Sequence, residues 1–376
     1  MKDAKQFPSP VRAMDSFHSL TPCASSSGTI VDMSHMNKIQ GIDSQDMTFT
    51  AQAALQLVEA SQFLRKVNLQ FMLNIEIGNI TLGSAACCQT KDALDCVEFG
   101  QVNSYVTRIK WVAPSGELGE ASEEENPDLL YLVRSSYGMC GIVYEVMFKV
   151  KPLEAVEFNY LPYKIDDLAQ EKVSTIIANN EAMVCWTVGR TTVIQTRNRK
   201  ADFNLKYPWL AGVRRIGWSR AGASVGRKIQ LIPNATLKNL IQDLWVKIQE
   251  FTYKLLNAIE VFSLYNPDKI INYAETPPDS RYAFTFWAFS RDQWVSNLKS
   301  YPEFSESHFK KHGFRCNMPL GSYYIKRDTS SILSYTHDGD IISIDPIHAY
   351  SDTDKSDWEY FLKEFRADSY CMYGIV

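Results

Sequence analysis

The sequence has no run of about 18 apolar residues, the length that a membrane-spanning helix needs. Residues 1–30 also lack the apolar core of a secretory signal peptide. These absences predict a chain that neither spans a membrane nor enters the secretory route. We therefore expect a cytoplasmic protein, in which the cysteines stay reduced.

The chain is also poor in features that attract nucleic acid or bind metal. Its formal net charge of −4 gives no general attraction to a polyanion. None of its eight cysteines forms a C-x-x-C pair, and we find no histidines at zinc-site spacing, so we expect no metal. The 45% apolar and 22% charged residues are typical of a soluble globular protein, and 376 residues are enough for two domains.

One segment of small residues stands out, Asn74–Asp92, with the sequence NIEIGNITLGSAACCQTKD. It turns at Gly78 and Gly83 and then continues through serine, alanine and cysteine. Small residues let a backbone approach something flat or polyanionic. The alternative is an ordinary tight turn between two packed elements.

Two further segments flank it. Residues 10–37 predict a short strand, a turn of small polar residues and a second strand at Gly28–Met33. In residues 127–151, Gly138 and Gly141 bracket a turn, and the following residues alternate as a strand does.

Together these segments resemble the flavin-binding domain of the vanillyl-alcohol-oxidase type, also called the PCMH-type FAD domain. The chain shows SFHS, TIVDM, IGNITLGSAACCQT, VAPSGELGEASEEENPDLL and YGMCGIVYEVMFKV in the order of that family. Five motifs in order, within residues 8–152, make the resemblance fairly specific. It implies an α+β fold, in which an N-terminally incomplete FAD domain precedes an α+β substrate or cap domain.

The resemblance also implies a domain plan. We expect the FAD-binding domain in residues 1–152, the substrate or cap domain in 153–350, and a C-terminal helix in 351–376 that returns toward the FAD domain. The family opens with a strand–helix–strand unit and closes with a Gly-Gly segment. Neither is recognisable here, so we expect a chain that is shortened at both ends.

The pattern of apolar residues predicts several elements directly. Thr50–Asn68 has a broad apolar face and predicts a helix. Leu237–Ile259 predicts a long amphipathic helix, capped near Asn234 or Thr236. The strands expected in the second domain include 184–196, 282–289 and 341–344.

The family places FAD against three of these segments. In members with a covalent flavin, the histidine of the His-Ser loop, here His18, bonds the cofactor; the alternative is a turn histidine held by nearby backbone. For every implied residue the alternative is ordinary turn or core packing. The implied contacts are Ser16, Phe17, His18, Ser19 and Leu20 in the loop, Gly78, Thr81, Gly83, Ser84, Ala85, Ala86 and Thr90 in the small-residue segment, and Gly141, Ile142 and Val143 in an adenine-side turn.

The chain departs from the family pattern at some of these places. Asp15 stands where the family has glycine, and its carboxylate near a pyrophosphate is electrostatically unfavourable. Gln89 and Lys91 replace residues of the family's Gly-Thr-His-Gly pattern. Cys87 and Cys88 could form a second covalent flavin bond, or they are buried structural thiols.

Oxidases of this type need a base, or a cation next to flavin N1. Candidates near the predicted strands are Arg281, Lys326 and His337, for which the alternative is a solvated charge on a strand. Residues 190–228 are rich in Lys and Arg and contain two tryptophans, which fits a membrane-surface or partner contact or, in the safer interpretation, a solvated loop.

The leading hypothesis is an FAD-dependent oxidoreductase. It would oxidise a small alcohol, sugar alcohol or sugar lactone by hydride transfer to flavin N5, and pass the electrons to O₂ or another acceptor. The alternative is a truncated, flavin-poor paralogue without catalytic activity, which acts as a binding protein or is a degraded reading frame.

Overall fold

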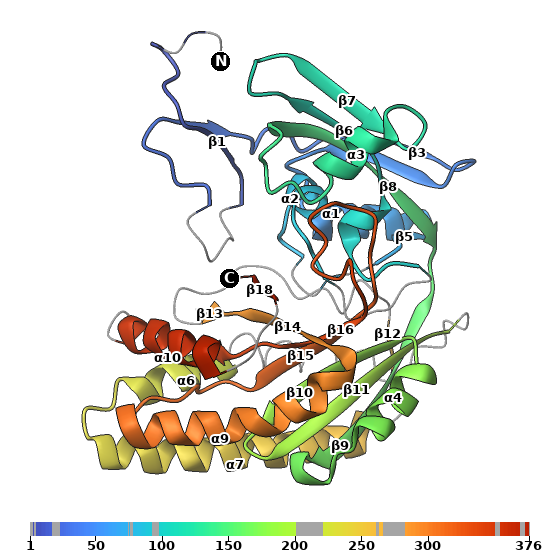
Figure 1. Cartoon of the computed structure of the whole chain (residues 1–376). Coiled ribbons are helices and arrows are strands. Elements are labelled where there is room, and N and C mark those ends of the chain that lie inside the picture. Colours follow the sequence, from blue (N-terminus) through green and yellow to red (C-terminus); the bar gives the residue numbers. More distant parts are fainter. Residues whose placement is uncertain are drawn as a thin grey trace.

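The computed structural model describes residues 3, 5–16, 23–73, 75, 78–91, 98–200, 221–260, 263–265, 283–349, 354–368 and 373–375. Figure 1 shows two sheets with their helices, one above the other. We call residues 39–152 the first part and residues 155–375 the second part. A small parallel pair, β1 (Val11–Met14) with β2 (Thr29–Asp32), lies beside the first part.

The sheet of the first part is antiparallel. Its strand order is β3-β4-β8-β6-β7, and β5 pairs with the far end of β8. Three phenylalanine rings, those of Phe49, Phe71 and Phe148, meet edge to face in its core with centroids 5.8 and 5.5 Å apart. The strands are β3 (Ile39–Asp43), β4 (Thr48–Gln52), β5 (Leu69–Phe71), β6 (Val106–Val112), β7 (Leu118–Ser122) and β8 (Ile142–Pro152).

The short helices of this part are α1 (Leu57–Lys66), α2 (Leu82–Cys87), α3 (Pro127–Val133) and the 3₁₀ turn η1 (Val102–Tyr105). The helix expected from Thr50 onward is wrong in its first residues, which belong to β4. There Phe49 and Ala51 are fully buried while their neighbours are half-buried, so the period is two rather than that of a helix.

The second part is built on an eight-stranded sheet of order β12-β9-β11-β10-β15-β16-β14-β18, with antiparallel neighbours. The strands expected around 184–196, 282–289 and 341–344 are confirmed. The strands are β9 (Ala155–Lys164), β10 (Ala182–Val188), β11 (Thr191–Lys200), β12 (Ser263–Tyr265), β14 (Phe286–Ser290), β15 (Leu320–Ile325), β16 (Ile341–Ile344) and β18 (Tyr373–Ile375), and a separate pair joins β13 (Ala283–Phe284) to β17 (Ile347–His348).

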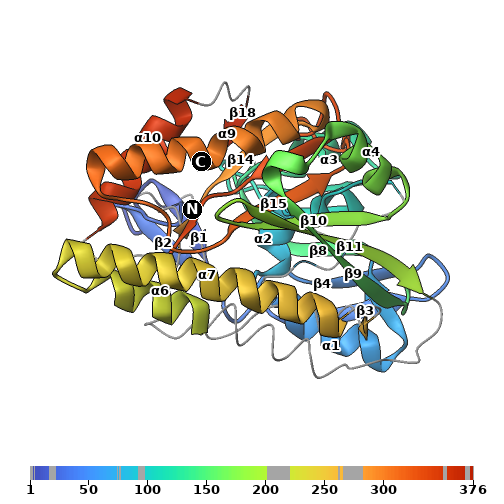
Figure 2. The ribbon, with the colours of Figure 1, turned by 90° about the horizontal axis from the view of Figure 1, so that it is seen from below.

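Helices cover both faces of this sheet, as Figure 2 shows for α9 and α7. Met183 and Cys185 of β10 point into one core, whereas Val184 and Trp186 point into another. A strand with both faces buried is a nearly continuous apolar run, and β10 is apolar at every position except Thr187. The helices are α4 (Gln170–Ala178), α9 (Trp294–His312) and α10 (Lys355–Asp368) on one face, and α6 (Ala223–Gln230) and α7 (Ala235–Glu260) on the other, with the short turns η2 (Ile165–Asp167) and η5 (Arg291–Gln293).

The long amphipathic helix expected from residue 237 is confirmed as α7. The Asn234 side chain accepts a hydrogen bond from the Leu237 amide at 2.9 Å, as an N-cap does. Among the helices that the structure describes, none combines the length and the apolar character needed to cross a membrane. The expected α+β class is confirmed, and the domain boundaries at residues 152 and 350 stay a proposal.

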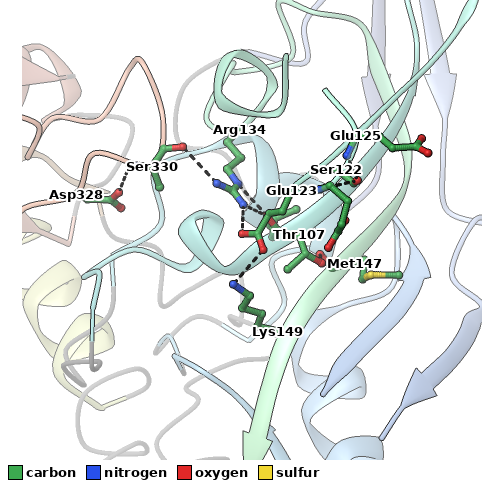
Figure 3. A network of polar contacts seen from close by, with 11 residues as sticks. Thr107, Ser122, Glu123, Glu125, Arg134, Met147, Lys149, Asp328 and Ser330 are labelled. Carbon is green, nitrogen blue, oxygen red and sulfur yellow. Dashed lines mark hydrogen bonds and ion pairs between the residues drawn. The ribbon is translucent and has the colours of Figure 1, made fainter. Parts of the chain in front are cut away.

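One segment of the second part reaches across to the first part. Residues 326–340, which we call the docking loop, run upward in Figure 1 to the region of α1 and α2. Buried Ser104 donates to Asp328, and Gln101 lies 3.2 Å from Ser334. In Figure 3 the Arg134 guanidinium reaches the Ser330 carbonyl at 3.5 Å. Buried polar contacts of this kind fix how the two parts meet.

Arg134 is central to the same network. Its Nε atom donates to the Val106 carbonyl at 2.8 Å, and its guanidinium pairs with Glu123 at 2.9 Å. Lys149 lies 3.0 Å from the other oxygen of Glu123. Burial lowers the pKa of Arg134 and Glu123 opposes that shift, so the cation is retained by its anionic neighbour.

Candidate functional site

The described start of the predicted His-Ser loop, Ser16, lies near the small-residue segment. Phe17, His18, Ser19 and Leu20 lie outside the described residues. Ser16 is described, and its hydroxyl accepts a hydrogen bond from Gln56 Nε2 at 3.4 Å. The backbone of Gln56 in turn forms a β-bridge with Thr81. The structure thus brings the predicted residues Ser16 and Thr81 into one neighbourhood.

The small-residue segment packs closely on the first part. The Gly78 carbonyl accepts from the Val58 amide at 2.8 Å, and the Thr81 hydroxyl caps α2 by accepting from the Ser84 amide. A methyl group on Gly83 would lie 2.8 Å from the Ala53 side chain, so glycine permits this close approach.

The remaining predicted residues of that segment differ in exposure. Ala85 and Ala86 lie fully buried in the first core, and Ser84 faces outward. Thr90 is half-buried, and its carbonyl accepts from the Val102 amide at 3.0 Å. Ser84 and Thr90 are therefore the side chains here with surface to offer a ligand.

A turn with unusual backbone conformation packs on the end of α2. Ser135 and Tyr137 have φ angles of 56° and 52°, a left-handed region that non-glycine residues rarely adopt. The Ser135 amide donates to the Ala86 carbonyl at 3.1 Å and the Tyr137 amide to the Cys87 carbonyl at 2.8 Å. Such strain gathers at functional sites.

The adenine-side turn that was predicted lies at the start of β8. Gly141 has φ of 135°, and a methyl group there would lie 2.2 Å from the Val112 carbonyl oxygen, so the turn requires glycine. Ile142 and Val143 are half-buried and pair with the end of β6.

A buried ion pair joins the end of the small-residue segment to the second sheet. Lys91 Nζ lies 2.5 Å from Asp345 Oδ2, and the two side chains are 18% and 2% exposed. The ammonium also lies over two rings, 3.9 Å from the centroid of Phe286 and 4.1 Å from that of Tyr323. Burial raises the pKa of Asp345, and Lys91 opposes that shift.

These partners share one face of the second sheet. In β15 and β14, Tyr323 and Phe286 alternate with residues that point into the core covered by α9 and α10, and Asp345 continues the face of Tyr323 and Phe286 after β16. We call this face the seam face. Gly100 of the first part also lies on it, because a methyl group there would be 2.8 Å from Ile325.

Several buried polar atoms at this seam have no hydrogen-bond partner among the residues that the structure describes. They are Gln89 Nε2, Tyr335 Oη, Asp345 Oδ1 and Ser135 Oγ. Gln89 Oε1 accepts from the Tyr335 amide at 2.8 Å, and the Tyr335 ring lies 4.9 Å from Phe286. Buried polar atoms without partners call for a ligand or water. Aromatic rings beside such atoms fit a planar, polar group such as a flavin.

The predicted catalytic residues fall in different places. Arg281 lies outside the described residues. Lys326 is half-buried after β15, and its amide nitrogen would lie 2.9 Å from a methyl group on Gly100. His337 is exposed, with its ring 3.3 Å from Asp338. Lys326 is thus at the seam, whereas His337 is on the outer surface of the docking loop.

The pairing of Lys91 with Asp345 is a feature of the site that the sequence motifs do not predict. In the sequence, Lys91 is recognisable only as a departure from the family pattern. The signal that could have found the pair is an acidic residue directly after an apolar strand, since Asp345 follows the four residues of β16. The partners are 254 positions apart in the sequence, which hides the contact from local patterns.

The two neighbouring cysteines are unsuited to nucleophilic attack. Burial raises the pKa of the Cys87 thiol to about 12 and that of Cys88 to about 11. A protonated thiol is a weak nucleophile. Their environment therefore supports structural thiols rather than a second covalent bond to a flavin.

The chain is similar in sequence to known flavin-linked proteins. Residues 1–122 match the family model described as an FAD binding domain. The curated relatives include L-galactono-1,4-lactone dehydrogenase 1, mitochondrial, of Oryza sativa subsp. japonica, 24% identical over 194 residues, which are 47% of this chain and 31% of that protein. A putative D-arabinono-1,4-lactone oxidase of Neurospora crassa is 27% identical over 135 residues, 36% of this chain and 24% of that one. The chain thus matches about a third or less of these relatives.

Solved structures share the fold of the whole chain. A cholesterol oxidase from B. sterolicum superposes with a TM-score of 0.69 at 15% identity, over 97% of this chain and 77% of that one. A solvent-stable cholesterol oxidase gives 0.69 at 13% identity, over 99% and 79%. At such identities the likeness concerns the fold alone. With the family match of residues 1–122, it agrees with the predicted α+β fold, in which an FAD-binding domain precedes a second domain, here built on an antiparallel sheet.

Proposed function

We infer the function of this chain from the match of residues 1–122 to the FAD-binding domain family. Our proposal is an FAD-dependent oxidoreductase that oxidises a small alcohol, a sugar alcohol or a sugar lactone. When bound, FAD would supply the hydride acceptor at N5, and O₂ or another acceptor would take the electrons. The lactone-oxidising names of the relatives support this substrate class.

The residues proposed to hold FAD surround the strained turn and the small-residue segment. The backbone amides of Ser135 and Tyr137 already donate to carbonyls of α2, so side chains have to supply polar contacts here. Ser84 and Thr90 offer hydroxyl groups beside them. The loop Ser16–Leu20 and the turn Gly141–Val143 would be further contacts, and the flavin would be bonded to His18 if it is covalent.

The observation that carries the proposal is the buried pair of Lys91 and Asp345. A hydroxyl group must lose its proton as its carbon loses hydride, and a carboxylate with a raised pKa is a suitable base. Asp345 Oδ1 has no partner among the described residues, so it can accept that proton. Lys91 orients the carboxylate and places a cation where negative charge develops.

Two other features support the same site. The rings of Phe286 and Tyr323 cover the ammonium and keep water away from it. The backbone of Lys326 lies at the seam beside Gly100, whereas exposed His337 has less support as a catalytic residue. The cytoplasmic location stays a prediction.

The experiment begins with the absorption spectrum of the purified protein. We expect the visible bands of an oxidised flavin, bleached under anaerobic conditions by L-galactono-1,4-lactone or a sugar alcohol. Asp345→Asn should keep the bands but slow the bleaching by roughly 10²–10⁴-fold, the usual contribution of a general base. The matched control is Asp338→Asn, an exposed carboxylate on the docking loop.

Two results would contradict the proposal. A folded, colourless protein that does not take up added FAD would support the alternative of a flavin-poor binding protein. Equal bleaching rates in Asp345→Asn and the parent protein would remove the seam pair from the mechanism.

A further inference from the structure

Two histidines and a glutamate face one another on the helices that cover the sheet opposite the seam face. His308 and His312 lie four residues apart on α9, so both point to one side of that helix. Glu364 comes from α10. One nitrogen of each ring and one carboxylate oxygen all lie within 4.8 Å of one another.

The distances within this cluster suit a small metal ion. His308 Nδ1 lies 2.7 Å from Glu364 Oε2, and His312 Nε2 lies 3.5 Å from Glu364 Oε1. Bonds of about 2.0–2.2 Å to a tetrahedral zinc ion place its ligand atoms about 3.4 Å apart. Each histidine faces a different oxygen of Glu364, and both distances lie within about 0.7 Å of that spacing.

The surroundings give the cluster both rigidity and access. The His308 side chain is 1% exposed and packs beside the rings of Phe361 and Phe304. His312 and Glu364 are 34% and 33% exposed, so an ion can enter from solvent. The Tyr360 hydroxyl donates to Glu364 Oε1 at 2.9 Å and orients the carboxylate, as the outer partners of metal ligands do.

We propose that His308, His312 and Glu364 bind a divalent transition-metal ion of the zinc class, with water in the fourth position. Two imidazoles and a carboxylate are a donor set that zinc accepts in proteins. The ion ties α9 to α10, and so fixes the helix that precedes β18. The sequence led us to expect no metal site. The spacing of His308 and His312 is only part of a ligand set, and the third ligand comes from another helix.

The test is a calorimetric titration of the full chain, without a polyhistidine tag and after treatment with a chelator, with zinc chloride. We expect one zinc per chain. His312→Asn and Glu364→Gln should each weaken binding by at least roughly 10–100-fold, the loss known for outer partners alone. Cobalt(II) should give the visible absorption of a tetrahedral site in the parent protein and not in His312→Asn.

A matched control separates this cluster from any histidine on the surface. His35 is exposed and lies outside the cluster, so His35→Asn should bind zinc as the parent protein does. Zinc should also raise the melting temperature of the parent protein and leave that of His312→Asn unchanged, because an ion stabilises only the state that binds it. Absence of saturable binding near one equivalent, or unchanged binding by His312→Asn, would overturn the proposal and leave a simple pairing of His308 with Glu364.

Discussion

Removing the Lys91 ammonium should destabilise the protein in a way that depends on pH. Lys91→Met keeps most of the side-chain volume but leaves the buried Asp345 carboxylate without its cation. Removing one partner of a buried pair typically costs about 3–5 kcal/mol of folding free energy. The loss of contact with the two rings adds about 0.5–1 kcal/mol.

Protonation of Asp345 sets an upper limit on the electrostatic part of the folding free energy that Lys91→Met loses. The carboxyl group can always become neutral, and its ordinary pKa is 3.8. Keeping a proton on it costs about 1.4 kcal/mol for each pH unit above that value, so the limit is about 4.4 kcal/mol at pH 7 and about 1.6 kcal/mol at pH 5. The loss of folding free energy in Lys91→Met should therefore be markedly smaller at pH 5 than at pH 7.

The sign follows from the direction of the pKa shift. Burial raises the folded-state pKa of Asp345, and the loss of Lys91 raises it further. Between the unfolded and the folded pKa, the folded protein binds a proton that the unfolded chain releases. Stability is then highest at low pH and falls as the pH rises through that window.

The assay is urea denaturation followed by tryptophan fluorescence at pH 5 and pH 7. Adding Asp345→Asn to the variant should restore most of the loss, because no buried charge then remains. Lys310→Met is the control, since Lys310 pairs with Glu306 on the exposed side of α9 and should contribute less than about 0.5 kcal/mol. A deficit that is equal at both pH values, or a double variant no more stable than the single one, would refute the reasoning.

Four further predictions concern the seam and the cofactor. Gly100→Ala should lower the free energy of unfolding in urea by about 1–3 kcal/mol, because its methyl group would lie 2.8 Å from a side chain of the second part, whereas Gly339→Ala has open space and should change it by less than about 0.5 kcal/mol. Arg134→Met should cost about 3 kcal/mol in the same assay by leaving buried acceptors unpaired, and unchanged stability would contradict the role of its network. Asp15→Gly should tighten FAD binding by about 1–3 kcal/mol in a fluorescence titration, because one like charge near the pyrophosphate is removed. Equal FAD affinity in the variant and the parent protein would contradict a position of Asp15 near the pyrophosphate. Acid-denatured protein should keep flavin fluorescence on a gel if the cofactor is covalent, and His18→Ala should abolish it; a signal that survives in the variant places the link elsewhere.

The sequence predicted those features of the fold that depend on local period. The helix α7 repeats apolar residues at helical spacing, and the strands around β10 and β14 are apolar runs bounded by polar residues, so their type could be predicted. The start of α1 could not, because Thr48–Gln52 carries apolar residues that suit a strand or the first turn of a helix. Pairing with β8 decided between them.

The site was predictable only where a motif was local. Gly83 and Gly141 could be identified because close backbone approach demands glycine. Lys91 could not be linked to Asp345, since nothing near either residue specifies the other. The His308 cluster shows the same limit, because two of its three ligands have a helical spacing and the third depends on how two helices pack.

The docking loop has a consequence for synthesis on the ribosome. The first part emerges early, but the residues that neutralise Lys91 and satisfy Gln101 come from positions 328–345. Domains generally fold as units, the N-terminal one first. Here the first part is made before Ser334, Thr336 and Asp345, which supply buried polar contacts to Gln101 and Lys91. Two polypeptides that each carry one of the sheets, expressed separately and then mixed, should therefore need each other to reach their native structures.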